Sequence, residues 1–336
     1  MRTLKNYRLR LERKRWRARA FRKRRELSVA INRTGQIQST DILLFSTIRN
    51  ECLRLPYFLS YYRNLGVDHF FFVDNGSRDD TVEYLSGQPD VTLFQTDASY
   101  KLARFGVDWL NWLQMRYAHG HWSIVVDADE FLIYPFCDTR PLRALTDWLD
   151  ASSIPSLSAM LLDMYAKGPL ADVDYQPGQN PFEITEWFDS GNYTIEPNYK
   201  FGNLWIQGGP RARSFFLEDT YAAPALNKTP LVKWDRGYCY VSSTHSLLPR
   251  RLNHTYETGG GERISGCLLH AKFLNDFASK REEELQRRQH YGEGREYEAY
   301  EESTVDADGF WSPYSSRYTG WRDLETLGLI SRGTWI

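Results

Sequence analysis

The stretch WSIVVDADEFLIYP, residues Trp122 to Pro135, joins a short apolar run to a group of three carboxylates. The apolar run is typical of a buried strand in a parallel sheet, which is covered on both faces. Asp127, Asp129 and Glu130 follow where that strand should end. Acidic residues in this place indicate a metal site, a catalytic site or an acidic turn.

Strands and helices alternate along the chain before this stretch. Short apolar runs predict strands at 42–48, 69–74 and 91–96. The segments between them have helical spacing, and one more helix is predicted at 107–118. This alternation predicts an α/β fold with a mostly parallel, Rossmann-like sheet and flanking helices.

Polar residues follow three of the predicted strands. They occupy positions 47–51, 74–80 and 127–130. In open α/β sheets, ligands bind beyond the carboxyl ends of the strands. We therefore expect the three groups to face one site, which favours a function for the acidic cluster over a simple turn.

The second half of the chain is predicted to elaborate the same domain. Strand-like patterns occur at 156–165, 202–216, 230–247 and 262–273. Residues 166–200 resemble a long loop, and 273–303 a charged, solvent-exposed helix. We expect a basic arm at 1–27, one domain at 41–300 with its boundary between halves at 135/136, and an extension at 301–336.

The arm carries most of the charge asymmetry. Residues 1–25 hold 13 Lys or Arg and one acid, so the remaining chain carries 29 basic and 42 acidic groups. The arm is predicted to be either a basic helix or disordered. As a helix it would suit an anionic membrane surface, with Trp16 and Phe21 as anchors. Because the body is acidic, no nucleic-acid partner is expected.

The four cysteines are scattered, which argues against a zinc knuckle or a disulfide framework. No apolar run approaches the ~20 residues that span a bilayer, and the N-terminal charge precedes no signal-peptide core. We expect a cytoplasmic protein, with peripheral contact at the inner face of the membrane as an option.

Asp127 and Asp129 have the spacing to share one hard cation. Two carboxylates suit Mg²⁺ or Mn²⁺, with substrate phosphates and water at the other positions. Such an ion assists the departure of a diphosphate. Glu130 points the other way along the strand and is expected to orient a basic or amide group.

Several motifs in combination resemble one enzyme family. They are TIRNE (47–51), GVDHFFFVDNGSRDDT (66–81) and WSIVVDADEFLIY (122–134), with weaker likeness at 207–215, 226–234, 242–247 and 268–273. Over about residues 41–300 the chain is similar to nucleotide-sugar glycosyltransferases of the GT-A fold, in the bacterial family-2 branch akin to family 92.

The resemblance implies a role for individual residues. Nucleotide contacts fall to Thr47, Glu51, Asp74 and Asp127, with uridine as the expected base. The metal falls to Asp127 and Asp129, completed by His270 or, as the alternative, His245. The basic residues expected at phosphate are Arg211, Arg213 and Lys228.

The catalytic base is the least defined residue. Inverting transfer needs a carboxylate to deprotonate the acceptor hydroxyl. Asp163, which ends a predicted strand, is preferred, and the alternatives are Glu186, Glu218 and Asp219. Family-2 relatives suggest inversion, but the sequence leaves retention open.

The leading hypothesis is a metal-dependent glycosyltransferase acting in cell-surface polysaccharide synthesis. Its donor would be a nucleotide diphosphate sugar and its acceptor a glycan or lipid-linked hydroxyl. The alternatives are a metal-dependent phosphoesterase or nuclease, which also uses clustered carboxylates, and a non-catalytic nucleotide-sugar-binding scaffold. The donor sugar, the linkage and the oligomeric state are not readable from the sequence.

Overall fold

The computed structural model describes residues 2–253, 263–287, 289 and 309–336. Its first half alternates strands and helices as predicted. The elements in chain order are α1 (Arg2–Lys23), β1 (Ser28–Ile31), β2 (Ile42–Ile48), α2 (Leu55–Leu65), β3 (His69–Asp74), α3 (Thr81–Ser86), β4 (Val91–Gln95), α4 (Val107–Tyr117) and β5 (Trp122–Val125).

The second half is richer in strands. Its elements are β6 (Glu130–Ile133), α5 (Leu142–Ala151), β7 (Ser156–Asp163), β8 (Trp187–Asp189), β9 (Tyr193–Asn198), β10 (Asn203–Gly208), α6 (Gly209–Phe215), β11 (Asn227–Lys233), β12 (Cys239–Ser242), β13 (Ser246–Leu248), β14 (Ser265–His270), α7 (Phe277–Arg287), β15 (Ser315–Arg317) and α10 (Trp321–Thr326).

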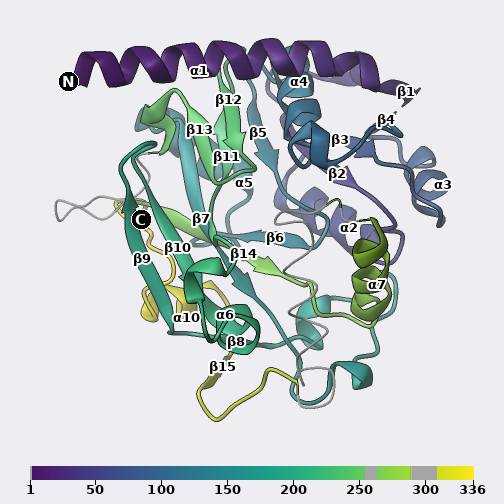
Figure 1. The fold of residues 1–336 in the computed structure, drawn as a ribbon, viewed down its shortest axis with the longest axis vertical. Helices are drawn as coiled ribbons and strands as arrows, with labels where there is room; N and C mark the ends of the chain where they lie inside the picture. The colour runs from purple at the N-terminus through teal and green to yellow at the C-terminus, as the bar shows by residue number, and fades with distance from the viewer. Residues whose placement is uncertain (1, 254–262, 288, 290–308) are drawn as a thin grey trace.

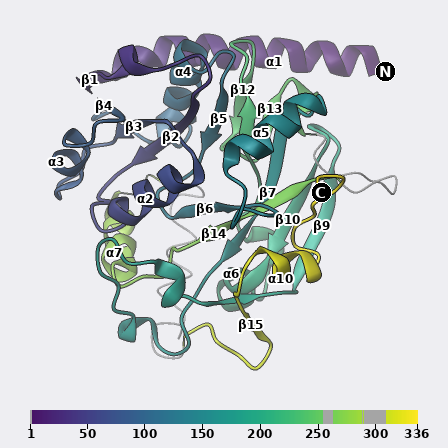
Figure 2. The ribbon, with the colours of Figure 1, turned by 180° about the vertical axis from the view of Figure 1, so that it is seen from behind.

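Nine strands form one central sheet in the order β1-β4-β3-β2-β5-β11-β7-β14-β6 (Figures 1 and 2). The pairings of β2, β3, β4 and β5 are parallel, as is that of β7 with β14. Only β1, β6 and β11 run against the other six strands. The predicted mixed α/β fold with a mostly parallel, Rossmann-like sheet is confirmed.

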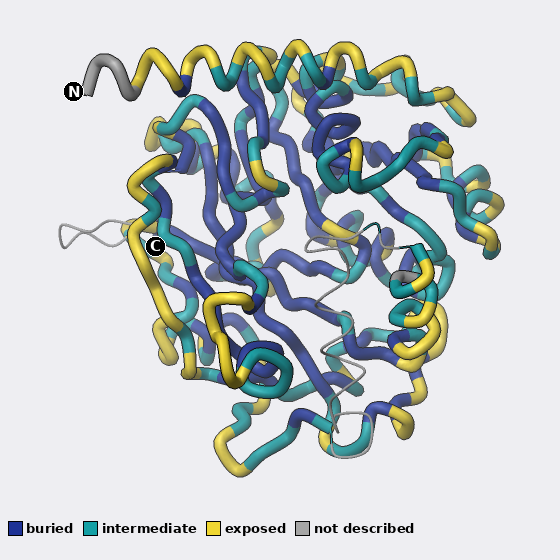
Figure 3. The backbone as a smooth tube through the Cα atoms, in the orientation of Figure 1, coloured by how far each residue is buried: buried dark blue, intermediate teal, exposed yellow. Residues whose placement is uncertain are grey.

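The continuous apolar strands arise because both faces of the sheet are covered. Alternate residues of β2 belong to different cores, with Leu44 packing on one face and Phe45 on the other. Helices α2, α3 and α5 supply apolar residues to the first core, and α4 to the second. Figure 3 shows the resulting buried strands at the centre of the molecule.

The acidic cluster lies in a connection between distant strands. β5 ends at Val125 near the middle of the sheet, whereas β6 starts at Glu130 on its far edge. Asp127 and Asp129 therefore sit in a turn and not on an extended strand. The turn is anchored by a hydrogen bond from the Ala271 N–H to the Asp129 carbonyl, at 2.8 Å.

Residues 202–216 are only half strand, which corrects the prediction. β10 pairs with β9 in a two-stranded sheet, and the chain then turns at two glycines into α6. Gly208 has φ +140°, and a Cβ there would lie 2.1 Å from the Asn192 carbonyl oxygen. The expected loop at 166–200 also contains β8 and β9.

The basic arm is a helix that lies against the body. α1 packs on α4 and β12 along one edge of the molecule (Figure 1). Leu9 joins a small core with Cys239 and Leu248. Trp16 lies under the Arg104 guanidinium at 4.1 Å, so Trp16 faces the protein and the expectation that it anchors lipid is wrong.

The C-terminal segment 309–336 completes the main core. β15 pairs with β8, and Trp321, Leu324 and Trp335 belong to the larger core cluster. The Trp335 ring meets those of Tyr134, Phe136 and Trp148 at 5.6–6.2 Å between centroids. The helix expected at 273–303 is observed as α7, and residues 288 and 290–303 lie outside the described part.

Across the described ranges, no helix combines the length and the apolarity needed to cross a membrane.

Replacing Trp335 should reveal whether the C-terminal segment stabilises the domain. Trp335 is 4% exposed, so we expect Trp335→Ala to lower the free energy of unfolding by about 3–5 kcal/mol through a lost contact and a cavity. The neighbouring Ile336→Ala is the control, because Ile336 is 88% exposed. Urea unfolding measures both; equal values would show that the segment does not support the core.

Candidate active site

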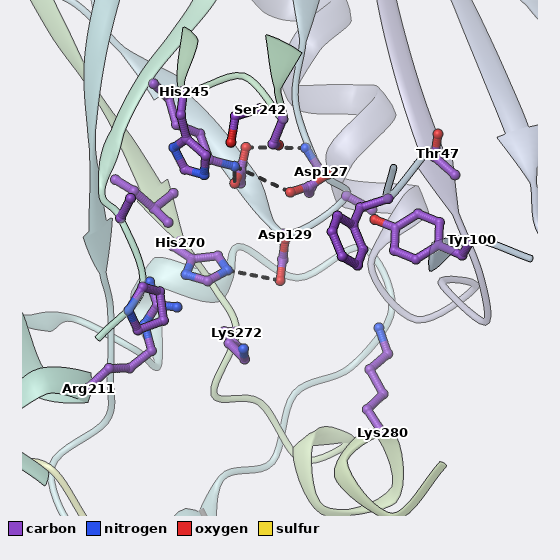
Figure 4. Close-up of a pocket in the computed structure, with 18 of the residues that line it drawn as sticks. Thr47, Tyr100, Asp127, Asp129, Arg211, Ser242, His245, His270, Lys272 and Lys280 are labelled. Carbon is purple, nitrogen blue, oxygen red and sulfur yellow. Dashed lines mark hydrogen bonds and ion pairs between the residues drawn. The ribbon is translucent and has the colours of Figure 1, made fainter. Parts of the chain in front are cut away.

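A cavity of about 1010 Å³ opens at the carboxyl ends of β2 and β5. Both halves of the chain line it. Thr47, Glu51, Asp127 and Asp129 come from the first half, whereas Lys228, His245 and His270 come from the second. Figure 4 shows His245 and His270 beside Asp127 and Asp129 of the acidic turn. The residues that follow β2 and β5 therefore meet at this cavity, and Asn75 is the residue of the group at 74–80 that lines it.

Sheet register places the central acid–histidine group. His270 is paired with Asp163 on β7 and with Glu130 on β6. The His270 ring bridges two carboxylates, with Nδ1 2.6 Å from Asp163 Oδ1 and Nε2 3.1 Å from Asp129 Oδ2. The Asp129–His270 pair points into the cavity (Figure 4), whereas Asp163 lies behind the histidine.

Charges in this group support one another. Burial alone would lower the pKa of His270, but Asp129 and Asp163 outweigh it and raise that pKa to about 9. Burial would raise the pKa of Asp129, and the charge and hydrogen bond of His270 hold it well below its usual range. Burial would also raise the pKa of Asp163, but Arg211 and His270 outweigh burial and lower that pKa.

Lys228 lies between the other two acids of the cluster. Its ammonium forms an ion pair with the buried Glu130 carboxylate and lies 3.3 Å from Asp127 Oδ2. Glu130 thus orients a basic group, as expected. Burial raises the pKa of Glu130, and the adjacent Lys228 charge opposes that shift. Asp127 remains open to the cavity, with 57% of its side chain exposed.

His245 is held by the backbone beside this cluster. Its Nδ1 is 2.7 Å from the Asn227 carbonyl oxygen, so Nδ1 carries the hydrogen and donates it. Burial, reinforced by the nearby Lys228 charge, lowers the pKa of His245 to about 4. His245 lines the cavity, and among the described residues its Nδ1 bonds to the Asn227 carbonyl oxygen and not to Asp129.

The predicted nucleotide residues differ in their exposure to the cavity. Thr47 lines the cavity, and Gly106 packs so closely that a Cβ there would be 2.6 Å from Thr47 Oγ1. Glu51 also lines it and accepts from Lys280 at 2.5 Å. Asp74 is buried and accepts from the Ser77 N–H at 3.1 Å. It builds the turn, and its contact with a nucleotide stays a prediction.

The structure separates the two arginines expected at phosphate. Residues two apart on a helix such as α6 point in different directions. Arg211 lines the cavity and donates to Asp163 at 2.8 Å. Arg213 points elsewhere, where it donates to Asp189 at 2.7 Å. Arg213 is not among the described residues that line the cavity, so the expectation that Arg213 contacts phosphate is corrected.

None of the four candidate bases is among the described residues that line the cavity. Asp163 is 1% exposed and engaged by Arg211 and His270. Glu186 forms an ion pair with Arg317, 2.6 Å away. Glu218 and Asp219 lie on an exposed loop. The assignment of a base therefore stays a prediction.

Helix α7 contributes cavity residues that the sequence analysis missed. Lys280 reaches Glu51, and Glu283 accepts from Arg49 at 2.7 Å and from Asn50 at 2.8 Å. The expectation that this helix is merely solvent-exposed is wrong. The signal was available: residues 280, 283 and 287 share one helical face and all line the cavity.

Asp129 and His270 could supply two ligands to one divalent ion once Nε2 of His270 gives up the proton that it donates to Asp129. Ligands ~2.1 Å from an octahedral ion lie about 3 Å apart, so the observed 3.1 Å, which is a hydrogen-bond distance, would need little change. Within the described ranges, no group of three or more His, Cys, Asp or Glu is placed to hold a metal. Phosphate oxygens and water would fill the remaining positions, as is usual for Mg²⁺.

No protein-family model and no curated protein matches this chain. Solved structures show distant similarity. One is a 4-diphosphocytidyl-2C-methyl-D-erythritol synthase, with 14% identity over 59% of this chain and 76% of that chain at a TM-score of 0.27. Another is a proposed glucose-1-phosphate thymidylyltransferase from Bacillus anthracis in complex with a sucrose. It has 11% identity over 76% of this chain and 98% of that chain, with a TM-score of 0.34. Both similarities are weak, and the fold assignment rests on strand order and packing.

Proposed function

We propose that this protein is a metal-dependent glycosyltransferase that uses a nucleotide diphosphate sugar, with UDP-sugar as the expected donor. The Asp129–His270 pair, exposed to a cavity with groups from both halves of the domain, carries this proposal. The acceptor would be a hydroxyl of a glycan or of a lipid-linked sugar, as in cell-surface polysaccharide synthesis.

In this proposal, Asp129 and His270 hold Mn²⁺ or Mg²⁺, with Asp127 beside them. When bound, the ion supplies positive charge for the diphosphate leaving group. Lys228 and Arg211 line the same cavity, each paired with a buried carboxylate. The acceptor oxygen bonds to the anomeric carbon as the bond from that carbon to the diphosphate breaks, and the hydroxyl proton passes to a base.

Asp163 is better suited to positioning than to proton transfer. Its carboxylate is buried behind His270, and Arg211 and His270 lower its pKa. A carboxylate that accepts from the far nitrogen of a metal-bound histidine orients the ring and strengthens it as a ligand. We infer that Asp163 holds His270 toward Asp129.

Nucleotide sugars together with Mn²⁺ should stabilise the protein against heat. A ligand that binds only the folded state adds about 2.7 kcal/mol at about 100 times its Kd. We expect the largest increase in Tm with a UDP-sugar plus Mn²⁺, and loss of the metal-dependent part in Asp129→Asn. Asp147→Asn, an exposed carboxylate on α5, is the control.

Product analysis separates this proposal from its competitors. Slow, Mn²⁺-dependent release of UDP from a UDP-sugar is the expected reaction. Cleavage of a phosphodiester without UDP release would favour the phosphoesterase alternative. Pyrophosphate release from a nucleoside triphosphate and a sugar phosphate would indicate nucleotidyl transfer. Tight binding without any turnover would support the scaffold.

Asp163→Asn tests the positioning role directly. We expect the Mn²⁺ concentration needed for half-maximal stabilisation to rise about 10–100-fold, because the His270 ring loses its carboxylate partner. Glu186→Gln, the surface carboxylate also considered as a base, should leave that concentration unchanged. If Asp163→Asn kept wild-type Mn²⁺ affinity but lost most of its turnover, the positioning role would be wrong and Asp163 would be the catalytic base.

A further inference from the structure

Helix α1 docks on the body by one face and turns a different face to solvent. With ~3.6 residues per turn, Leu9, Trp16 and Ala20 share the inner face, and Leu9 and Ala20 are buried. Arg19 strengthens the contact by donating to the buried Asp108 carboxylate at 2.6 Å. The orientation of α1 is therefore determined by packing and by an ion pair.

The outward face of α1 is apolar along its centre. Tyr7, Leu11 and Ala18 share one stripe opposite the inner face, and all are exposed. Tyr7 is 58% and Leu11 47% exposed. The spacing of Tyr7, Leu11 and Ala18 by four and seven residues places them on one side of the helix, and packing has left that side to solvent. Figure 3 shows exposed turns along the outer side of α1.

Cations flank this stripe. Arg8, Arg15 and Arg22 recur every seven residues along one side of it, and Lys14 lies on the other side; all four are exposed. The rest of the chain has an excess of acidic groups, 42 against 29 basic ones outside residues 1–25. The outward face of α1 is thus a local cationic surface on an acidic protein, and its partner has to be anionic.

We propose that this outward face, defined by Tyr7, Arg8, Leu11, Lys14, Arg15, Ala18 and Arg22, binds an anionic lipid bilayer. An apolar stripe with three arginines on one side and Lys14 on the other suits the boundary between headgroups and acyl chains. A nucleic-acid backbone would use the cations but would leave Tyr7 and Leu11 without a partner. The apolar stripe therefore favours lipid over nucleic acid.

The cavity lies one layer beneath α1. Arg104 lines the cavity, and its guanidinium stacks on Trp16 of α1. Val241 and Ser242 of β12, the strand on which α1 packs, also line the cavity. A protein held to lipid by α1 keeps this cavity near the bilayer. The docking surface itself does not depend on which reaction the cavity supports.

Vesicle cosedimentation of the full chain tests the proposal with point variants. Deletion of α1 is unsuitable, because it would uncover Cys239 and Leu248. Vesicles of phosphatidylcholine are compared with vesicles of equal parts phosphatidylcholine and phosphatidylserine. We expect binding to the anionic vesicles only. Added salt should weaken this binding, because screening by ions shortens the range of electrostatic attraction.

Arg8→Glu/Arg22→Glu should reduce binding to the anionic vesicles roughly tenfold or more. The matched control is Arg116→Glu/Arg236→Glu, which reverses two exposed arginines that are not part of α1 and should change binding less than about twofold. Tyr7→Ser/Leu11→Ser should also weaken vesicle binding, although it preserves every charge.

Three results would overturn the proposal. The first is no binding of the wild type to anionic vesicles. The second is an equal loss in both charge-reversed variants, which would indicate non-specific attraction. The third is binding to a double-stranded DNA fragment, unaffected by Tyr7→Ser/Leu11→Ser, without vesicle binding; this result would assign the outward face to nucleic acid.

Discussion

The pairing of β14 with β7 on one side and β6 on the other is the constraint on which the candidate site depends. It aligns His270 with Asp163 and Glu130 across three neighbouring strands. Main-chain hydrogen bonds therefore determine where the imidazole stands, and the Ala271 N–H ties the acidic turn to the same strand. Because these contacts belong to a sheet covered on both faces, the group is held without relying on mobile side chains. The cavity opens where this rigid frame ends.

Charge compensation explains how so many ionised groups are tolerated below the cavity. Burying an isolated charge is costly, and a buried pair is retained only when partners and hydrogen bonds offset its loss of water. Here Arg211 faces Asp163, and Lys228 faces Glu130. Asp129 and Asp127 remain at the cavity surface, each beside one cation. The buried carboxylates of Asp163 and Glu130 are each paired with a cation, whereas those of Asp127 and Asp129 at the cavity surface are only partly compensated. A bound cation, together with a phosphate-bearing ligand, would complete the compensation there.

Two charged helices, one near each end of the chain, extend this frame. α1 covers α4 and β12, and α7 reaches the polar residues that follow β2 through Lys280 and Glu283. In both helices, the side chains that face the protein are partly charged and find partners of opposite sign. The spacing of apolar residues alone therefore predicts the wrong face of α1 to pack against the protein. For α7 it predicts no packed face at all.

Much of the sheet could be read from sequence because its signals are local. Continuous apolar strands and the helical spacing between them are properties of adjacent residues, and they defined the fold class and the placing of Thr47, Glu51 and Asp127 at one edge. What only the tertiary structure decided depends on contacts between distant residues. These contacts chose His270 over His245 as the neighbour of Asp129, placed Asp163 behind that histidine and turned the apolar stripe of α1 outward. Register and helix orientation come from distant partners, such as His270 and Asp163, 107 residues apart, and Arg19 and Asp108, 89 residues apart. Local patterns do not contain this information.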